Sequence, residues 1–180
     1  MTRLFRHRDS PPFVTVPLHT RPEGTRPAEP LPTDILLVED DPLEVEITLR
    51  PLRELDPDSR VEVARDGEEA LDFLLGRGGF RHRLQAPLPR LVLLDLELPK
   101  LDGIEVLRGV RSNARTCTVP MVVLTSSTDP RRLAQCYQLG ANSCVQKPVR
   151  YEEFRSAIQM VVRYWLGLNQ APPSAAQPVV

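Results

Sequence analysis

Short apolar runs alternate with longer amphipathic segments along the middle of this chain. Five runs that are apolar or alternate in strand fashion predict β-strands, at 35–38, 60–64, 91–94, 121–124 and 143–146. The segments between them place apolar residues three or four positions apart, which predicts helices starting at 42 and over 67–75, 104–110, 130–139 and 151–168. Because most of the strands are apolar throughout, both of their faces should be buried. The pattern therefore predicts an α/β fold, a doubly wound five-stranded parallel sheet with helices on both sides.

Proline and glycine mark several helix ends in this pattern. Asp41 and Pro42 suit the N-cap and the first turn of the first helix. Pro51 should kink that helix or end it early, because proline lacks a backbone N–H. Gly140 follows the helix at 130–139, as expected of the residue just beyond a helix end. Residues 76–90 show neither the spacing of a helix nor the alternation of a strand, so we predict a long loop there.

The two ends of the chain differ in composition from its middle. Seven of the 19 prolines and five arginines lie within residues 1–33, which lack sustained periodicity. Such a segment cannot bury enough apolar surface to offset the entropy of ordering, so we expect a disordered tail. Residues 170–180 should form a second, short tail. The predicted domain spans 34–169, since a chain of 180 residues suits one domain better than two.

Charge and cysteine content narrow the class of protein. The 23 basic and 24 acidic side chains nearly cancel, so the basic excess that nucleic-acid binding requires is missing. No run of 18 apolar residues predicts a membrane span, and no apolar segment follows the first arginines, as a secretory signal would require. Three cysteines, Cys117, Cys136 and Cys144, show neither paired nor metal-ligand spacing. We therefore expect a cytoplasmic protein with reduced thiols.

Charged and hydroxyl side chains follow the predicted strands directly. Glu39 and Asp40 follow the first strand, Asp95 the third, Thr125 the fourth and Lys147 the fifth. The carboxyl ends of strands form the ligand site in doubly wound sheets, so these side chains should meet in one pocket. Neighbouring carboxylates repel one another unless a proton or cation bridges them, and an all-oxygen ligand set suits Mg²⁺. A carboxylate beside Mg²⁺ can accept a phosphoryl group, which the lysine and the hydroxyl would hold.

Four motifs in order carry a resemblance to a known family. They are Glu-Asp-Asp at 39–41, Leu-Leu-Asp-Leu-Glu-Leu-Pro-Lys-Leu-Asp-Gly at 93–103, Thr-Ser-Ser at 125–127 and Lys-Pro at 147–148. Their order and intervals resemble those of the receiver domain of two-component response regulators. The lysine carries weight because only two of the 23 basic residues are lysines. The resemblance covers about residues 34–169 and implies the flavodoxin-like (βα)5 receiver fold.

The resemblance implies a role for each acidic residue of the site. Asp95 would be the phosphoacceptor. Asp40 would bind Mg²⁺ directly and Glu39 largely through water. Glu97 would lend its backbone carbonyl to the metal, while its side chain would be solvated.

The resemblance also implies how the site acts on its surroundings. Thr125 matches the switch hydroxyl, and Lys147 matches the lysine that holds the phosphoryl group, followed by a cis peptide bond to Pro148. Many receivers have an aromatic residue that turns inward on phosphorylation, and this chain has Cys144 at that position. The usual coupling between hydroxyl and ring therefore cannot operate through residue 144, and Tyr137 is a possible substitute.

Two features are similar to one subgroup of the family. The loop at 76–90 is longer than in an ordinary receiver, and the last helix ends in Tyr-Trp-Leu at 164–166. Both resemble small stand-alone regulators paired with phytochrome-type histidine kinases, although a tolerated surface insertion would also explain the loop. This resemblance implies a kinase of that type as partner. It also implies a homodimer formed by the fourth helix, the fifth strand and the last helix.

The last predicted helix has more apolar surface than a sheet needs. Phe154, Ile158, Val161 and Trp165 form one stripe, and Met160, Tyr164 and Leu168 form a second. One stripe suffices to cover a sheet face, so the second is available for a partner. The alternative is that both belong to one broad stripe facing the core.

These observations predict a single-domain response regulator that accepts a phosphoryl group from a histidine kinase onto Asp95 with Mg²⁺. It would not be an enzyme beyond its own phosphotransfer and dephosphorylation. About ten residues follow the last helix, so we expect no output domain. Three alternatives remain open. They are a phosphorelay intermediate, a Mg²⁺-dependent phosphohydrolase with Glu97 in place of its general-acid aspartate, and a flavin-binding module, in which the acids at 39–41 would repel the phosphate.

Overall fold

The computed structural model describes residues 32–170, so nearly all of the two predicted tails lies outside the described residues. Five strands form one sheet: β1 (Ile35–Val38), β2 (Val61–Ala64), β3 (Leu91–Asp95), β4 (Met121–Thr125) and β5 (Ser143–Gln146). Neighbouring strands are parallel, and their order is β2-β1-β3-β4-β5. This is the flavodoxin-like order, and it confirms the predicted doubly wound parallel sheet.

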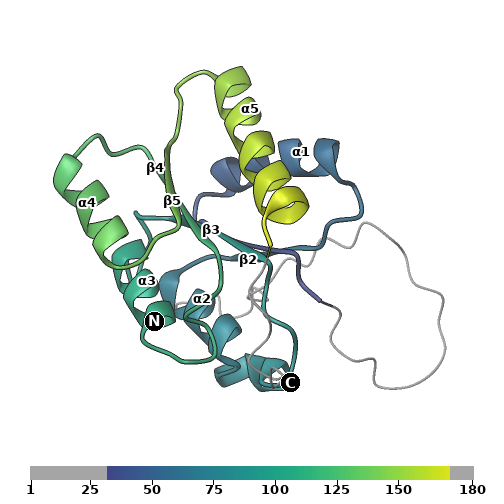
Figure 1. Cartoon of the computed structure of the whole chain (residues 1–180), viewed down its shortest axis with the longest axis vertical. Coiled ribbons are helices and arrows are strands. Elements are labelled where there is room, and N and C mark those ends of the chain that lie inside the picture. Colours follow the sequence, from purple (N-terminus) through teal and green to yellow (C-terminus); the bar gives the residue numbers. More distant parts are fainter. Residues whose placement is uncertain (1–31, 171–180) are drawn as a thin grey trace, which may run out of the picture.

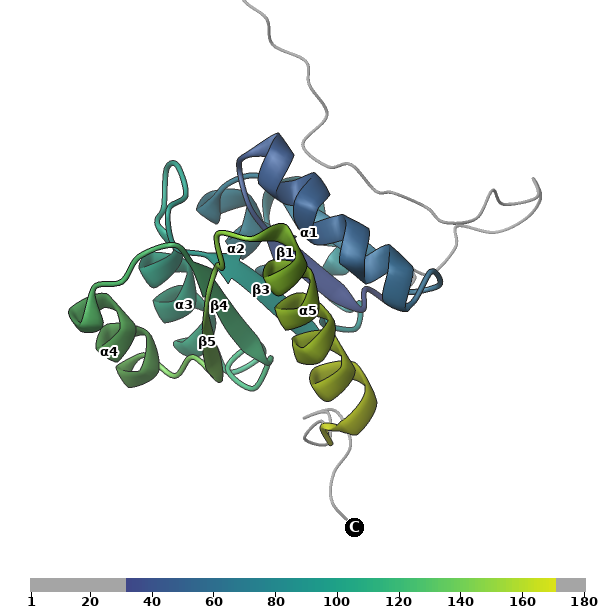
Figure 2. The same ribbon diagram turned by 90° about the horizontal axis from the view of Figure 1, so that it is seen from above.

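Five α-helices connect the strands and cover both faces of the sheet. They are α1 (Pro42–Leu55), α2 (Gly67–Leu75), α3 (Gly103–Arg111), α4 (Pro130–Gln138) and α5 (Tyr151–Val162). Figures 1 and 2 show α1 and α5 side by side on one face and α2, α3 and α4 on the other. No helix within residues 32–170 is long and apolar enough to cross a membrane.

The sheet divides the core into two layers. Side chains at alternate positions of β1 and β3, such as Ile35 and Leu91, pack under α1 and α5, and their neighbours, such as Leu36 and Val92, pack under α2 and α3. Successive strand residues point to opposite faces, which explains why the central strands are apolar throughout. The helical layer packs less closely at the β5 edge of the sheet. In α4 the single buried residue is Cys136, and β5 is half-exposed.

Two predictions about the connections are corrected by the structure. Helix α1 does not end early but continues through Pro51 to Leu55. Pro51 cannot bond the carbonyl of residue 47, yet it is buried, and the packing of Leu49 and Leu52 into the core maintains the last turns. The loop at 76–90 contains a short 3₁₀ helix, η1 (Gly78–Arg83). Arg115 anchors this segment by donating hydrogen bonds to the backbone carbonyls of Leu74, Arg83 and Ala86.

The two apolar stripes of the last helix lie in different environments. Phe154 and Ile158 are buried, and Val161 and Trp165 pack against the same layer. Met160, Tyr164 and Leu168 are 71%, 49% and 72% exposed. The second stripe is therefore surface, and the alternative of one broad core-facing stripe is wrong. The helix also changes character, because α5 passes into a π-helical segment, η2 (Arg163–Leu168).

Candidate functional site

The predicted site residues gather at the carboxyl edge of the sheet. Asp95 and Thr125 end β3 and β4, while Glu39 and Lys147 directly follow β1 and β5. This edge includes the carboxyl ends of the neighbouring strands β1 and β3, between which the strand order reverses. Glu39, Asp95 and Thr125 are only 4%, 6% and 8% exposed. Buried polar groups of this kind require partners, and the structure supplies them.

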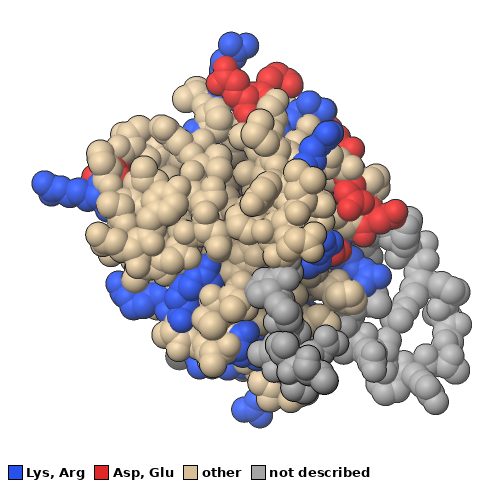
Figure 3. Space-filling view, viewed as in Figure 1, with Lys and Arg blue, Asp and Glu red and all other residues tan. Residues whose placement is uncertain are grey.

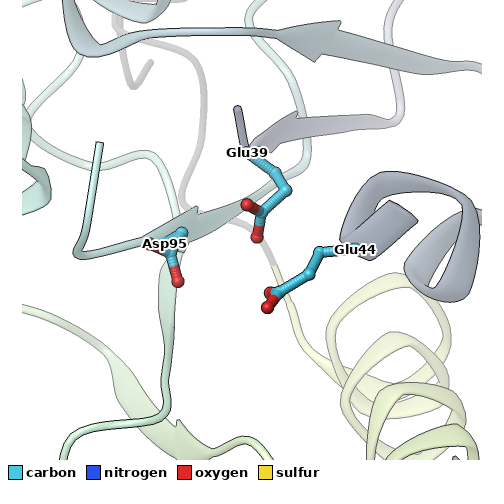
Figure 4. Close-up of side chains that lie close together, drawn as sticks. All are labelled: Glu39, Glu44 and Asp95. Atoms are coloured by element: carbon cyan, nitrogen blue, oxygen red, sulfur yellow. The ribbon is translucent and has the colours of Figure 1, made fainter. Parts of the chain in front are cut away.

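Lys147 is the centre of the site. Its Nζ lies 2.7 Å from Oδ1 of Asp95 and 2.9 Å from Oε2 of Glu39, and it also contacts Oε2 of Glu44. An ammonium group has three N–H donors, so these three carboxylates can satisfy all of them. Figure 4 shows the carboxylates of Glu39, Glu44 and Asp95 pointing toward one another.

Burial and charge act against each other on Glu39 and Lys147. Burial raises the pKa of Glu39 to about 7, although its hydrogen bond with Lys147 lowers it. Burial alone would lower the pKa of Lys147, but its hydrogen bonds with Asp95, Glu44 and Glu39 hold it above the ordinary lysine value. Lys147 is therefore charged at neutral pH, while Glu39 is close to its midpoint.

The acidic residues at the site are suited to a divalent cation. One carboxylate oxygen from each of Glu39, Glu44 and Asp95 lies within 4.8 Å of the others. Hard oxygen ligands of this kind are those that Mg²⁺ and Mn²⁺ prefer. Asp40, which we expected to bind the metal directly, is exposed and is not part of this group within the described chain. Its role as a ligand stays a prediction.

Glu97 connects Asp95 to α4. Its backbone N–H donates to Oδ2 of Asp95 at 2.5 Å. Its side chain is 63% exposed, and Oε1 lies 3.4 Å from the guanidinium of Arg132 on α4. The prediction that this carboxylate is solvated therefore holds except for the contact with Arg132. The role of the Glu97 carbonyl as a metal ligand stays a prediction.

Thr125 lies at the end of β4 with its hydroxyl bonded locally. Oγ1 accepts a hydrogen bond from the Ser127 N–H at 3.0 Å, and the Thr125 carbonyl accepts one from the Lys147 N–H at 2.7 Å. The expected cis bond between Lys147 and Pro148 is wrong for this structure, because the described residues contain no cis peptide bond. Lys147 reaches the three carboxylates with a trans bond.

Sequence reasoning missed Glu44 as a site residue, and it did not decide whether Tyr137 substitutes for the aromatic residue that Cys144 replaces. Glu44 stands at the third position of α1, where a glutamate ordinarily indicates a helix cap rather than a site residue. Tyr137 on α4 accepts a hydrogen bond from the backbone N–H of Cys144 at 3.3 Å. The tyrosine is thus in contact with the position where many receivers have their aromatic residue.

Comparisons with known proteins agree with this geometry. The family model for the response regulator receiver domain matches residues 35–159. FilR2, a probable methanogenesis regulatory protein of Methanothrix harundinacea, is 41% identical over 145 residues, which cover 80% of this chain and 90% of that protein. The response regulator Rcp1 of Synechocystis is 33% identical over 135 residues, which cover 75% of this chain and 90% of Rcp1.

Two solved structures extend the similarity. Rcp1 with Mn²⁺ bound superposes with a TM-score of 0.71 at 33% identity, covering 78% of this chain and 99% of that one. The phosphorylated cyanobacterial phytochrome response regulator RcpA gives a TM-score of 0.73 at 30% identity, with coverage of 78% and 99%.

Proposed function

Because this chain belongs to the response regulator receiver family, we propose that it is a switch in which a histidine kinase phosphorylates Asp95 and a partner reads the change at the face of α4, β5 and α5. The observation that carries the proposal is the convergence on Lys147 of Asp95 and Glu39, two buried carboxylates from different strand ends. A buried acceptor beside a fixed cation is suited to phosphoryl transfer, which depends on positioning and charge neutralisation.

Each residue of the site has a task in the transfer. The bond from phosphorus to the kinase histidine breaks as a bond from phosphorus to a carboxylate oxygen of Asp95 forms. Lys147 and the hydroxyl of Thr125 would then hold the phosphoryl oxygens, which carry about two negative charges in the product at neutral pH. A bound Mg²⁺ ion would neutralise part of this charge. We assign it to Asp95 and Glu39, whose carboxylate oxygens lie within 4.8 Å of each other, and, from the resemblance to the family, to Asp40 and the carbonyl of Glu97.

The α4 and β5 parts of the proposed reading face are weakly packed, since α4 buries Cys136 alone and β5 has no fully buried residue. Leu133 and Tyr137 of α4 are 45% and 51% exposed, and β5 is an edge strand. The contact between Glu97 and Arg132 joins the loop after Asp95 to α4. A charge added at Asp95 therefore acts close to an element that can shift at little cost in buried surface.

The same face would carry a homodimer. Met160 on α5, together with Tyr164 and Leu168 in the η2 segment that continues this helix, adds exposed apolar surface. Figure 3 shows few charged residues on the surface between α4 and α5, with charged side chains at the start of α5 and at the outer side of α4. A typical stable interface buries about 800 Å² on each partner, which this face could supply with its neighbours.

We propose a phytochrome-type histidine kinase as the phosphoryl donor, because RcpA is a phytochrome response regulator and shares this fold. A cytoplasmic location agrees with three free cysteines in the described chain. Among the alternatives, a phosphorelay intermediate would use the same site residues. A phosphohydrolase receives no support from Glu97, since its carboxylate contacts Arg132 on α4.

Intact mass after incubation with Mg²⁺ and acetyl phosphate tests the proposal. We expect the wild type to gain one phosphoryl group and Asp95→Asn to gain none. Asp56→Asn, at the far end of α1, is the matched control and should label like the wild type. Equal labelling of Asp95→Asn and wild type would remove Asp95 from its role. No labelling of the wild type by acetyl phosphate or by a phytochrome-type kinase would contradict the proposed function.

A further inference from the structure

Glu44 does not make the contact that its position in α1 predicts. A glutamate at the third position of a helix often bonds back to the N–H of the N-cap residue. In α3 this capping box is complete, because the N–H of Asp102 donates to Oε2 of Glu105 at 3.1 Å. Helix α1 begins with the same spacing, Asp41 followed by Glu44, so a second capping box would be expected.

Glu39 takes the place of Glu44 in this cap. The N–H of Asp41 faces Oε1 of Glu39 at 3.3 Å. The carboxylate of Glu44 is therefore free to turn toward the strand ends, where it contacts Nζ of Lys147. Glu44 thus gives up the capping contact within α1 and instead links α1 to Lys147 at the end of β5.

The three carboxylates around Lys147 differ in depth. The side chains of Glu39 and Asp95 are 5% and 8% exposed, whereas that of Glu44 is 47% exposed. The two inner carboxylates are those that the proposed reaction uses, Asp95 as acceptor and Glu39 toward the metal. The ammonium group contacts both, so a cation that binds these carboxylates competes with it.

Space for a movement of Lys147 exists beside Glu44. A pocket of about 160 Å³ lies between α1 and the start of α5, and both Glu44 and Lys147 line it together with Val149 and Tyr151. A lysine that moves toward this pocket leaves the inner carboxylates while it stays in contact with Glu44.

We propose that Glu44 is a positioning residue for Lys147, and this inference rests on the proposed function. Glu44 holds the Lys147 ammonium at the outer side of the site when a divalent cation binds to Glu39 and Asp95. Two cations at the same carboxylates repel each other, and Glu44 gives the lysine a separate partner. Without Glu44 the ammonium has only the inner carboxylates, so it competes more strongly with the metal.

The test compares Mg²⁺ binding in the full chain and two variants. Glu44→Gln should weaken Mg²⁺ binding about tenfold, the effect of one charge-assisted hydrogen bond. Glu46→Gln is the matched control, because it removes the same charge from the same helix at a residue that pairs with Arg53 away from Lys147. It should change the affinity less than twofold. Equal affinities of Glu44→Gln and wild type would overturn the proposal.

Measuring Glu44→Gln in a Lys147→Met background distinguishes positioning of the lysine by Glu44 from direct binding of the metal by Glu44. If Glu44 acts through the lysine, Glu44→Gln should have no further effect on Mg²⁺ affinity in Lys147→Met. An equal loss in both backgrounds would overturn the proposal, because it would show that Glu44 binds the metal itself or acts only by its charge.

The two lysines of the chain allow Lys147 to be observed directly. Lysine labelled with ¹³C at Cε gives two side-chain signals, and Lys100, which pairs with Asp66, serves as the internal reference. In Mg²⁺-saturated protein, Glu44→Gln should move the Lys147 signal and leave that of Lys100 in place. An unmoved Lys147 signal would overturn the proposal. This measurement requires that Glu44→Gln folds and that enough Mg²⁺ is added to saturate it.

The outcome is distinguishable from that of the proposed function. Mg²⁺ binding and the lysine spectrum do not require phosphorylation. Normal labelling of Asp95 together with no effect of Glu44→Gln would reject the inference alone. Absence of labelling would reject the proposed function, whatever the lysine spectrum shows.

Discussion

Nζ of Lys147 and Oε2 of Glu39 lie 2.9 Å apart although 108 positions separate the two residues in the chain. Their contact joins the ends of β5 and β1 across the two strands between them. Lys147 only partly offsets the burial of Glu39, so the pKa of this carboxyl is still raised to about 7. Protonation of Glu39 is therefore expected to matter near neutral pH.

The affinity for Mg²⁺ should rise with pH through the pKa of Glu39. A carboxyl must lose its proton before it can help to bind a cation, so affinity should increase between about pH 6 and 8. In Glu39→Gln the increase over this range should be largely lost. Mg²⁺ titrations of both proteins at several pH values provide the measurement. An equally steep rise in the variant would assign the titration to another group.

The raised pKa of Glu39 also predicts the pH dependence of stability in Mg²⁺-free buffer. The folded-state value of about 7 exceeds the reference value of 4.5, so the folded state binds the proton more tightly than the unfolded state. The resulting stabilisation is fully present below pH 4.5 and is lost as pH rises through about 7. Between about pH 4.5 and 7, the unfolding free energy from urea titrations should therefore decline more steeply in the wild type than in Glu39→Gln, and above this range the two should run parallel. Parallel declines within this range would contradict the assignment.

The sequence predicted the fold well because each strand has its own apolar run and each run is closed by a polar residue. Asp95, Thr125, Glu39 and Lys147 could be placed together because parallel strands end at the same edge. The position of Glu44 could not be predicted, since it depends on which carboxylate accepts the Asp41 N–H. The tertiary structure determines whether Glu39 or Glu44 accepts this hydrogen bond.

Other misses have similar causes. The continuation of α1 through Pro51 depends on burial against the core, which outweighs the local cost of proline. The order within the 76–90 loop depends on Arg115, which comes from a distant segment.

Lys100 has a left-handed backbone conformation, with φ of 65°, in the loop that follows Asp95. Its Nζ lies 2.5 Å from Oδ2 of Asp66, the N-cap of α2. Lys100→Gly and Lys100→Ala both lose this ion pair, but only glycine relieves the backbone strain. The glycine variant should be more stable than the alanine variant by about 1 kcal/mol in urea unfolding. An alanine variant of equal or greater stability would show that the conformation costs nothing.

Gly103 is required by the close approach of α3 to the end of β3. A Cβ at this position would lie 2.3 Å from the Asp95 carbonyl oxygen and 2.7 Å from Cα of Leu96. Both neighbours are backbone atoms, so Gly103→Ala should cost more than about 2 kcal/mol of unfolding free energy and slow the phosphorylation of Asp95. Gly79→Ala is the control, because nothing lies within 4 Å of its Cβ, and it should change stability by less than about 0.5 kcal/mol. Similar stabilities of the two variants would contradict this account.

The exposed stripe of the last helix predicts a dimer that a single charge disrupts. Met160 is 71% exposed, and at a dimer interface it would be buried in an apolar environment, where a glutamate has no partner. Light scattering after size exclusion should therefore show a dimer for the wild type and a monomer for Met160→Glu at about 100 μM. Leu43→Glu is the matched control, since Leu43 is 69% exposed but lies on α1, outside the proposed face. A dimer that persists in Met160→Glu and dissociates in Leu43→Glu would move the interface to α1, and a monomeric wild type would reject the dimer altogether.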